Sequence, residues 1–511
     1  MRDLVLILFV FSILPIALFR PFIGLLLWAW IGYMNPHRLT WGFAYNFRFN
    51  LIIAAVTIIG ILVTTRFRFR IPWKAPIVLT SIFLFWTVIT TYYAFQYGSA
   101  VSELDRFIKI QLMVFATLIV VKNRKQIIAL VTLIALSIGF YGVKGGFFTL
   151  TSGGNFRVMG PENSFFVDNN SFALAMLMTL PMIYFVQLQF KSLLPRLISI
   201  AAMLLCVLSI LGSYSRGGFI GLSVLGITIL IKSRHRFIII ALLFFVLPPV
   251  YQFMPEHWHN RMGVLIQSGL DSLNQKASST ISEVAMNQLN LPTTALPNKP
   301  VTKSHNIQSV GQGLVDFLLE SDSEIVRDKS VAGRFDAWRF SIRVANANPI
   351  LGGGFNTFDQ SVYDRYTPGV QRRAPHSIFF EVLAEHGYVG FFIWLALHIS
   401  GMLTASKVIR MTRRDPEVLW ARDLAAMLQV SLISYYITGL FLGMAYFDLP
   451  YHIIAILVIL RVHIENHYRE QPAKAPSTEW IHPGLRQRRP NTTPTGRGDG
   501  KFPWQKGLTA R

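Results

Sequence analysis

The chain consists mostly of apolar runs separated by short polar or cationic stretches. A helix that crosses a membrane needs about 20 mostly apolar residues, and thirteen runs reach or approach that length. They cover residues 4–19, 21–34, 50–65, 75–95, 107–121, 126–141, 171–190, 197–212, 216–231, 237–253, 388–406, 424–446 and 451–464. The first two are short and meet at Arg20-Pro21, so they form either a hairpin or one broken helix. The pattern predicts an all-α polytopic membrane protein with 12 or 13 spans.

Composition supports this prediction. Of the 511 residues, 52% are hydrophobic and only 14% are charged, whereas a soluble domain carries about 25% charged residues. The 48 Lys and Arg against 26 Asp and Glu give a net charge of +22. In a chain full of apolar runs, positive loops on the cytoplasmic face explain this excess better than nucleic-acid binding. The single cysteine, Cys206, lies within an apolar run and is expected to be a small buried hydrophobe.

The cationic residues fall in alternate loops, which orients the chain. By the positive-inside rule, these loops face the cytoplasm: 66–74, 122–125, 191–196, 232–236 and 407–414. The orientation divides the chain into four parts: N-terminal membrane helices (1–253), one large periplasmic loop (254–387), C-terminal membrane helices (388–464) and a basic, disordered cytoplasmic tail (465–511). Within the large loop, the polar stretch 268–328 is expected to be a loosely ordered insertion.

One arginine lies where this orientation gives it no topological role. Arg216, in the run SYSRGG at residues 213–218, begins a span at its outer end. Its guanidinium either snorkels to the interface or binds a phosphate with its planar fork. The glycines that follow, at 217, 218 and 221, are interpreted as positions of close helix packing.

A second arginine precedes an amphipathic pattern in the large loop. Residues 337, 338, 341, 342 and 345 repeat at helical spacing, which predicts a helix in the plane of the interface. Asn348-Pro349 and the following glycines end it. Arg334 is expected at the start of this helix, where backbone N–H groups point outward. It is either a solvated surface arginine or an anion ligand, and the Gly-rich stretch alone is a weak signal for phosphate.

A histidine lies between Pro375 and Gly387, residues that can start and end a helix. The eleven residues between them would form a helix about 16 Å long, too short for a hydrocarbon core of about 30 Å. A short interfacial or re-entrant helix is therefore expected before the span 388–406. His376 is placed in its first turn, where the helix dipole keeps the ring neutral, as a general base requires. The alternative is an interface histidine without a chemical role.

Other polar groups lie at the outer ends of spans. Asp168 and Asn169 precede the span 171–190, where a helix N-cap is the first interpretation and hydrogen bonding to sugar hydroxyls the second. Together with Arg157 and Ser215, they complete the candidate substrate-binding residues. No set of side chains has a spacing that favours a metal site, and no glycine pattern favours a nucleotide. We therefore expect neither a metal nor another cofactor.

These segments together resemble the O-antigen ligase superfamily, which includes protein O-glycosylation ligases and lipopolysaccharide polymerases. The matching elements are Ser215-Arg216-Gly217, Gly333-Arg334 to Trp338, Asn348 to Phe355, and His376-Ser377 to Gly387 and Gly390. The resemblance covers roughly residues 140–446. The opening MRDL and the run NPHRL at residues 35–39 further resemble the subgroup of O-glycosylation ligases associated with exosortase systems.

The resemblance implies a GT-C-like glycosyltransferase of the bacterial inner membrane whose active site faces the periplasm and needs neither metal nor nucleotide. The donor would be a glycan on undecaprenyl diphosphate, and the acceptor a hydroxyl of a protein, a lipid or another glycan. The family's catalytic histidine maps onto His376 and its two diphosphate-binding arginines onto Arg216 and Arg334. Two alternatives remain open: an O-antigen or exopolysaccharide polymerase, and a non-enzymatic exporter of lipid-linked glycans.

Overall fold

The computed structural model describes residues 1–66, 69–162, 164–232, 244–245, 248–249, 251–260, 263 and 329–470. Every regular element in this part of the chain is a helix. The α-helices are α1 (Arg2–Phe19), α2 (Pro21–Met34), α3 (Phe49–Thr65), α4 (Ala75–Tyr92), α5 (Tyr97–Val120), α6 (Arg124–Thr151), α7 (Asn169–Gln189), α8 (Leu193–Gly212), α9 (Arg216–Lys232), α13 (Lys329–Ala347), α14 (Gln360–Tyr366), α15 (Ile378–Met411), α16 (Leu419–Gly439) and α17 (Asp448–Glu470). Short 3₁₀ helices lie at Pro36–Leu39, Phe43–Asn46 and Pro416–Val418.

The helices confirm an all-α polytopic membrane protein. Within the described residues, six helices are long and apolar enough to cross a membrane: α1, α4, α6, α7, α8 and α15. Three shorter apolar helices, α2, α3 and α9, coincide with expected spans, as do the more polar α5, α16 and α17. The expected span 237–253 lies largely outside the described residues, as do the stretch 268–328 and most of the tail 465–511. The GT-C-like arrangement stays a prediction.

The first two helices form a hairpin. The chain turns at Arg20, which has non-helical dihedral angles (φ −130°, ψ 80°), and Pro21 begins α2. At the other end of α1, the Asp3 carboxylate accepts hydrogen bonds from the backbone N–H groups of Gly42 (3.1 Å) and Ala44 (3.0 Å). Those residues follow α2 closely, so the start of α1 and the end of α2 lie together. This selects the hairpin from the two arrangements that the sequence leaves open.

Cationic loops gather at one end of the helices, here called the basic end. Glu465 near the end of α17 pairs with Lys74 before α4 (2.7 Å), Lys407 late in α15 (3.7 Å) and Arg461 (2.8 Å). Arg124 at the start of α6 lies over the ring of Trp420 near the start of α16, with its guanidinium carbon 4.9 Å from the ring centre. The alternation of loops along the sequence is thus reproduced by contacts between distant segments.

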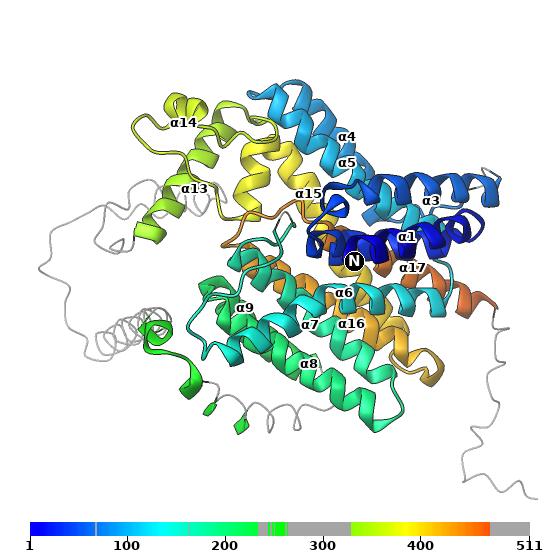
Figure 1. The fold of residues 1–511 in the computed structure, drawn as a ribbon. Helices are drawn as coiled ribbons and strands as arrows, with labels where there is room; N and C mark the ends of the chain where they lie inside the picture. The colour runs from blue at the N-terminus through cyan, green and yellow to red at the C-terminus, as the bar shows by residue number, and fades with distance from the viewer. Residues whose placement is uncertain are drawn as a thin grey trace, which may run out of the picture. The chain divides into compact units, whose positions relative to one another are not determined.

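The core lies among α6, α7, α8 and α16, which Figure 1 shows side by side. α7 is buried along almost its whole length. Small residues allow close approach here, as is common between membrane helices: a Cβ at Gly146 of α6 would lie 2.1 Å from the Leu205 carbonyl oxygen of α8. Cys206 is buried beside this contact, as expected.

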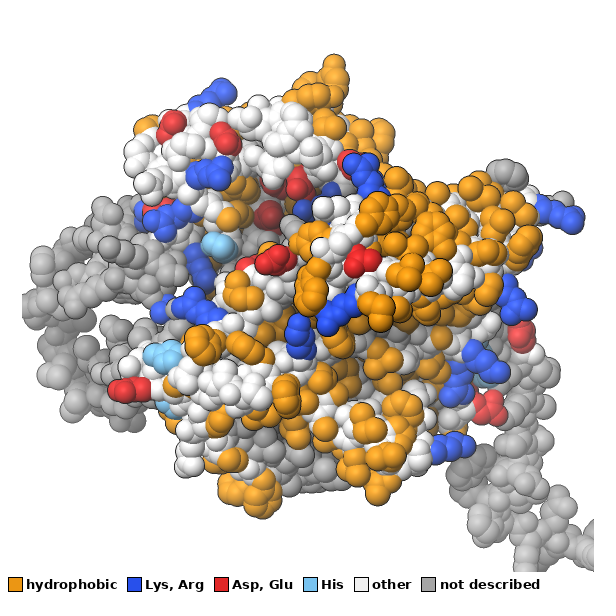
Figure 2. Space-filling model, in the orientation of Figure 1, with side chains coloured by type: hydrophobic (Ala, Val, Ile, Leu, Met, Phe, Trp, Pro, Cys, Tyr) orange, Lys and Arg blue, Asp and Glu red, His pale blue; other side chains and the backbone are white. Residues whose placement is uncertain are grey.

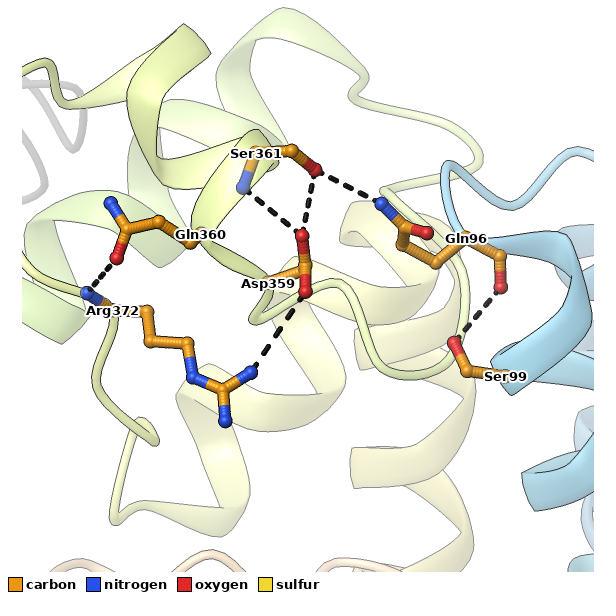
Figure 3. A network of polar contacts seen from close by, with 6 residues as sticks. All are labelled: Gln96, Ser99, Asp359, Gln360, Ser361 and Arg372. Carbon is orange, nitrogen blue, oxygen red and sulfur yellow. Dashed lines mark hydrogen bonds and ion pairs between the residues drawn. The ribbon is translucent and has the colours of Figure 1, made fainter.

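The end opposite the basic loops carries α13 and α14, which the loop before α15 connects to the membrane helices (Figure 1). A polar network anchors α14 (Figure 3). The Asp359 carboxylate caps α14 by accepting from the N–H (3.0 Å) and hydroxyl (2.7 Å) of Ser361, and Gln96 donates to the same hydroxyl (3.0 Å). Arg372 lies 3.9 Å from Asp359. Because Gln96 directly precedes α5, this network connects the large loop to the α4–α5 turn.

Candidate active site

A short helical segment lies at the centre of the candidate site, as the sequence predicts. α15 begins at Ile378 and is interrupted at Gly387, whose dihedral angles (φ 66°, ψ −173°) are accessible to glycine only. The segment before the break is about 13 Å long at 1.5 Å per residue, too short to cross a membrane. The expected end at Gly387 is confirmed, and the long span follows directly.

The glycine-rich loop after α13 caps this short segment. Gly353 N–H donates to the Ala384 carbonyl (2.8 Å), and Gly354 N–H donates to that of Glu385 (2.7 Å). The indole of Trp86 in α4 donates to the His386 carbonyl (3.1 Å). The last carbonyls of a helix otherwise have no partner. These glycine N–H groups are therefore engaged in capping the helix, which explains the Gly-rich stretch without a phosphate.

Gly387 packs directly against the backbone of the Asn348-Pro349 turn. A Cβ there would lie 2.5 Å from the Ile350 carbonyl oxygen and 2.8 Å from that of Pro349. Gly387→Ala is expected to lower thermal stability markedly, because strain of about 1–3 kcal/mol adds to an overlap with backbone that cannot rotate away. Gly369→Ala is the matched control: its φ is also positive (80°), but a Cβ there meets no atom within 4 Å. Equal melting temperatures for the two purified variants would contradict this account.

His376 lies before the helix, not in its first turn. Ser377 is the N-cap residue, and His376 itself has a left-handed backbone (φ 42°). The expectation that Pro375 starts the helix is therefore wrong. The Pro375 carbonyl instead accepts a hydrogen bond from the indole of Trp338 in α13 (2.8 Å), and the Trp338 ring stacks on Phe380 (5.0 Å between centroids). These contacts hold the His376 loop between α13 and α15.

Charged groups from two other segments act on His376. The surrounding protein atoms and the positive charge of Arg334 lower the pKa of His376 below its usual value, and the negative charge of Asp168 raises it in part. His376 remains exposed to solvent. The ring is therefore neutral near pH 7 and accessible. The ring is neutral because of desolvation by the surrounding protein atoms and the charge of Arg334, and not because of the expected helix dipole.

Arg334 lies in the second turn of α13 rather than at its start, because α13 begins five residues earlier at Lys329. Its guanidinium carbon lies 5.8 Å from the centre of the Phe441 ring. Gly217 also lies beside Phe441: a Cβ there would be 3.6 Å from the Phe441 Cβ. Phe441 thus contacts both α13 and the start of α9. This arrangement brings the segments that carry the two predicted arginines to one residue.

Arg216 is the first residue of α9, as expected. The helix start is fixed by Ser215, whose hydroxyl accepts from the Gly218 N–H (3.0 Å). Ser215 is 2% exposed, so it positions Arg216 and presents little surface of its own. The interpretation as packing positions is confirmed at Gly218, where a Cβ would lie 2.8 Å from that of Ala173 in α7, and at Gly221, where a Cβ would lie 2.6 Å from the Leu177 Cδ1. A Cβ at Gly217 would make only ordinary contacts.

The Asp168 and Asn169 side chains have structural partners. Asp168 caps α7 by accepting from the N–H groups of Asn170 (2.9 Å) and Ser171 (3.1 Å), which confirms the N-cap interpretation. The Asn169 amide donates to the Ser213 carbonyl (2.8 Å) and so connects α7 to the turn before Arg216. Arg157 lies near the same turn: burial raises the pKa of Tyr214, and the nearby charge of Arg157 offsets part of that rise.

The surface is hollowed beside α13 and α14 (Figure 2). Figure 2 shows basic, acidic and histidine side chains gathered along that hollow, whereas hydrophobic side chains cover much of the surface of the first helices. Arg334 and Asp168 each lie within electrostatic reach of His376. The arrangement combines a neutral imidazole, guanidinium charge and a carboxylate at one place. Such a set can accept a proton and stabilise an anionic leaving group.

Two stretches of the chain match known families. Residues 201–395 match the O-Antigen ligase family. The matched region contains the segments with Arg216, Arg334 and His376, and the match supports a relation to the O-antigen ligase superfamily and a glycan-ligating enzyme. Residues 1–190 match a family of unknown function, DUF5935. No curated protein matches the chain. The exosortase-associated subgroup stays a prediction.

Two carboxylates in the region that matches the O-Antigen ligase family, the buried Glu385 and the half-buried Glu381, are missed by the sequence analysis. Glu385 accepts from the Tyr446 hydroxyl (2.6 Å) and the Asn356 N–H (2.9 Å), and Glu381 accepts from the Ala445 N–H (2.8 Å). Their spacing of four residues puts them on one face of the short helix. That spacing in an otherwise apolar helix is the signal that could have indicated them.

The loop after α16 is the second missed feature. The expected span 424–446 is wrong at its outer end, because α16 ends at Gly439 and residues 440–447 leave the helix. The two carboxylates hold this loop through Ala445 and Tyr446, and Phe441 lies against Arg334. Because the loop is apolar, hydropathy does not distinguish it from the end of a membrane span. The loop forms one wall of the site.

Proposed function

We propose that this protein transfers a glycan from undecaprenyl diphosphate to an acceptor hydroxyl at the periplasmic face of the bacterial inner membrane. One observation supports the proposal most. His376, in the region that matches O-antigen ligases, lies within reach of the charges of Arg334 and Asp168. The periplasmic position rests on the basic end, which by the positive-inside rule faces the cytoplasm. The site lies at the opposite end of the helices.

In the proposed reaction, a ring nitrogen of His376 takes the proton of the acceptor hydroxyl. The oxygen attacks the anomeric carbon as the bond from that carbon to the diphosphate oxygen breaks, and undecaprenyl diphosphate leaves. Arg334 and Arg216 would stabilise the charge that develops on the diphosphate, because the guanidinium fork matches phosphate oxygens. These cations would take the place of a metal ion. The energy comes from the donor itself, since nucleotide sugars and ATP are cytoplasmic.

The acceptor is proposed to be a serine or threonine hydroxyl of an exported protein or a sugar hydroxyl of a lipid core. Asn169 and Ser215 are proposed to act on the substrate indirectly, by fixing the turn before Arg216. Asp168 is proposed to act through its charge on His376. Arg157 is proposed as a further diphosphate-binding residue, because its charge acts on Tyr214, two residues before Arg216.

Reconstitution is the direct test. The purified full-length protein in proteoliposomes is given an undecaprenyl-diphosphate glycan and a candidate acceptor, with chelator and without nucleotide. We expect the glycan on the acceptor and free undecaprenyl diphosphate in equal amounts. Lengthening of the lipid-linked glycan instead would identify the polymerase alternative. Movement of the intact donor between leaflets without any transfer would identify the exporter and contradict the proposal.

A further inference from the structure

A cleft lies at the basic end, which is opposite the end of the helices that carries the candidate site. It is formed where the α1–α2 corner meets the ends of α3 and α5 and the start of α6. Its volume is about 460 Å³, within the range of about 300–1,000 Å³ typical of small-molecule sites. The corner at Arg20 interrupts the helix and so leaves room beside the neighbouring helix ends.

The chemistry of the cleft is that of an amphiphile site. Apolar side chains make most of its wall: Phe22, Ile23, Ile61, Ile119 and Val120. Two cations, Arg20 and Lys122, also line it, and no carboxylate does. Both cationic residues are exposed. Within the described residues, neither side chain makes a hydrogen bond or ion pair, whereas Lys74 and Lys407 at the same end are paired with Glu465.

We propose that this cleft binds an anionic phospholipid of the membrane, with the headgroup phosphate between Arg20 and Lys122 and an acyl chain along the apolar wall. Basic pockets between membrane helices on the cytoplasmic side bind anionic headgroups, and the basic end is the end expected there. A free phosphate would leave the apolar wall unused. A zwitterionic lipid such as phosphatidylcholine carries a positive group beside its phosphate, so its headgroup has no net charge to balance the two cations. The anionic lipid satisfies both parts of the cleft.

Native mass spectrometry of the detergent-purified full chain tests the proposal, with phosphatidylglycerol, phosphatidylcholine and inorganic phosphate as separate probes. Wild-type protein is expected to retain phosphatidylglycerol in preference to the other two. A cation near a membrane surface contributes about 1 kcal/mol to binding an anionic lipid, which corresponds to about a fivefold change in Kd. The double variant Arg20→Gln/Lys122→Gln should therefore weaken phosphatidylglycerol binding by about 25-fold.

Arg413→Gln/Arg414→Gln is the matched control, because it removes the same charge from another loop at the same end and neither residue lines the cleft. It should bind phosphatidylglycerol like the wild type. Val120→Trp keeps both cations but fills the apolar wall, and it should also weaken binding. Equal affinity of the double variant and the control, or equal retention of phosphatidylcholine by the wild type, overturns the proposal. If the double variant does not fold, the two single variants and Val120→Trp decide it.

Discussion

Replacing His376 by alanine is expected to lower glycan transfer by about 10²–10⁴-fold, the usual contribution of a general base. Without the imidazole, no group at that position takes the proton of the acceptor hydroxyl. Donor binding should change much less, because the diphosphate is held by the arginines in the proposed reaction. The measurement is the initial rate of transfer in proteoliposomes, with donor retention measured separately.

The His376→Ala protein should remain folded. The side chain is exposed and makes no hydrogen bond within the described residues, so its removal leaves no buried group without a partner. His376→Gln keeps a polar side chain that cannot act as a base and should be equally inactive. Gln371→Ala, an exposed position in the same loop, is the control and should transfer normally. Normal transfer by well-folded His376→Ala would remove histidine from the mechanism.

The membrane helices were predictable because hydrophobic length is a strong local signal. Helix ends were less so, and residues 440–447 show why. These residues are as apolar as a membrane span. However, the Ala445 N–H and the Tyr446 hydroxyl donate to Glu381 and Glu385, which lie on another helix. A contact between residues more than 60 positions apart leaves no trace in local hydropathy. The α1–α2 hairpin was undecided for the same reason, since Asp3 contacts residues beyond α2.

The candidate site was predictable where one residue type has one dominant local role. Asp168 is a helix cap because a carboxylate before an apolar run accepts from free N–H groups. The environment of His376 was predicted for the wrong reason: a proline before a helix usually occupies its first turn, but here Trp338 binds the Pro375 carbonyl and the helix begins later. The neutral ring results from tertiary surroundings and from Arg334, which lies on α13.

Replacing Arg334 by glutamine is expected to reduce transfer by about 10²–10³-fold, the usual loss when one group that stabilises developing charge is removed. A second effect distinguishes Arg334 from a residue that only binds the donor. Its positive charge lowers the pKa of His376, so its removal raises that pKa. On acidification, the ring is then protonated at a higher pH than in the wild type, and once protonated it cannot act as a base. The acid limb of kcat/KM should therefore move to higher pH.

Two matched variants test whether this shift of the acid limb comes from the ring of His376. Asp168→Asn keeps a side chain that caps α7 but removes a negative charge that raises the pKa of His376, so its acid limb should move to lower pH. Arg216→Gln should lose transfer by a similar factor, but Arg216 is not among the charges that shift His376, so the limb should stay in place. Opposite shifts for Arg334 and Asp168 with none for Arg216 require that the titrating group is the ring of His376. A limb that stays fixed in all three variants would mean that a different group, or a step other than proton transfer, sets the pH dependence of the reaction.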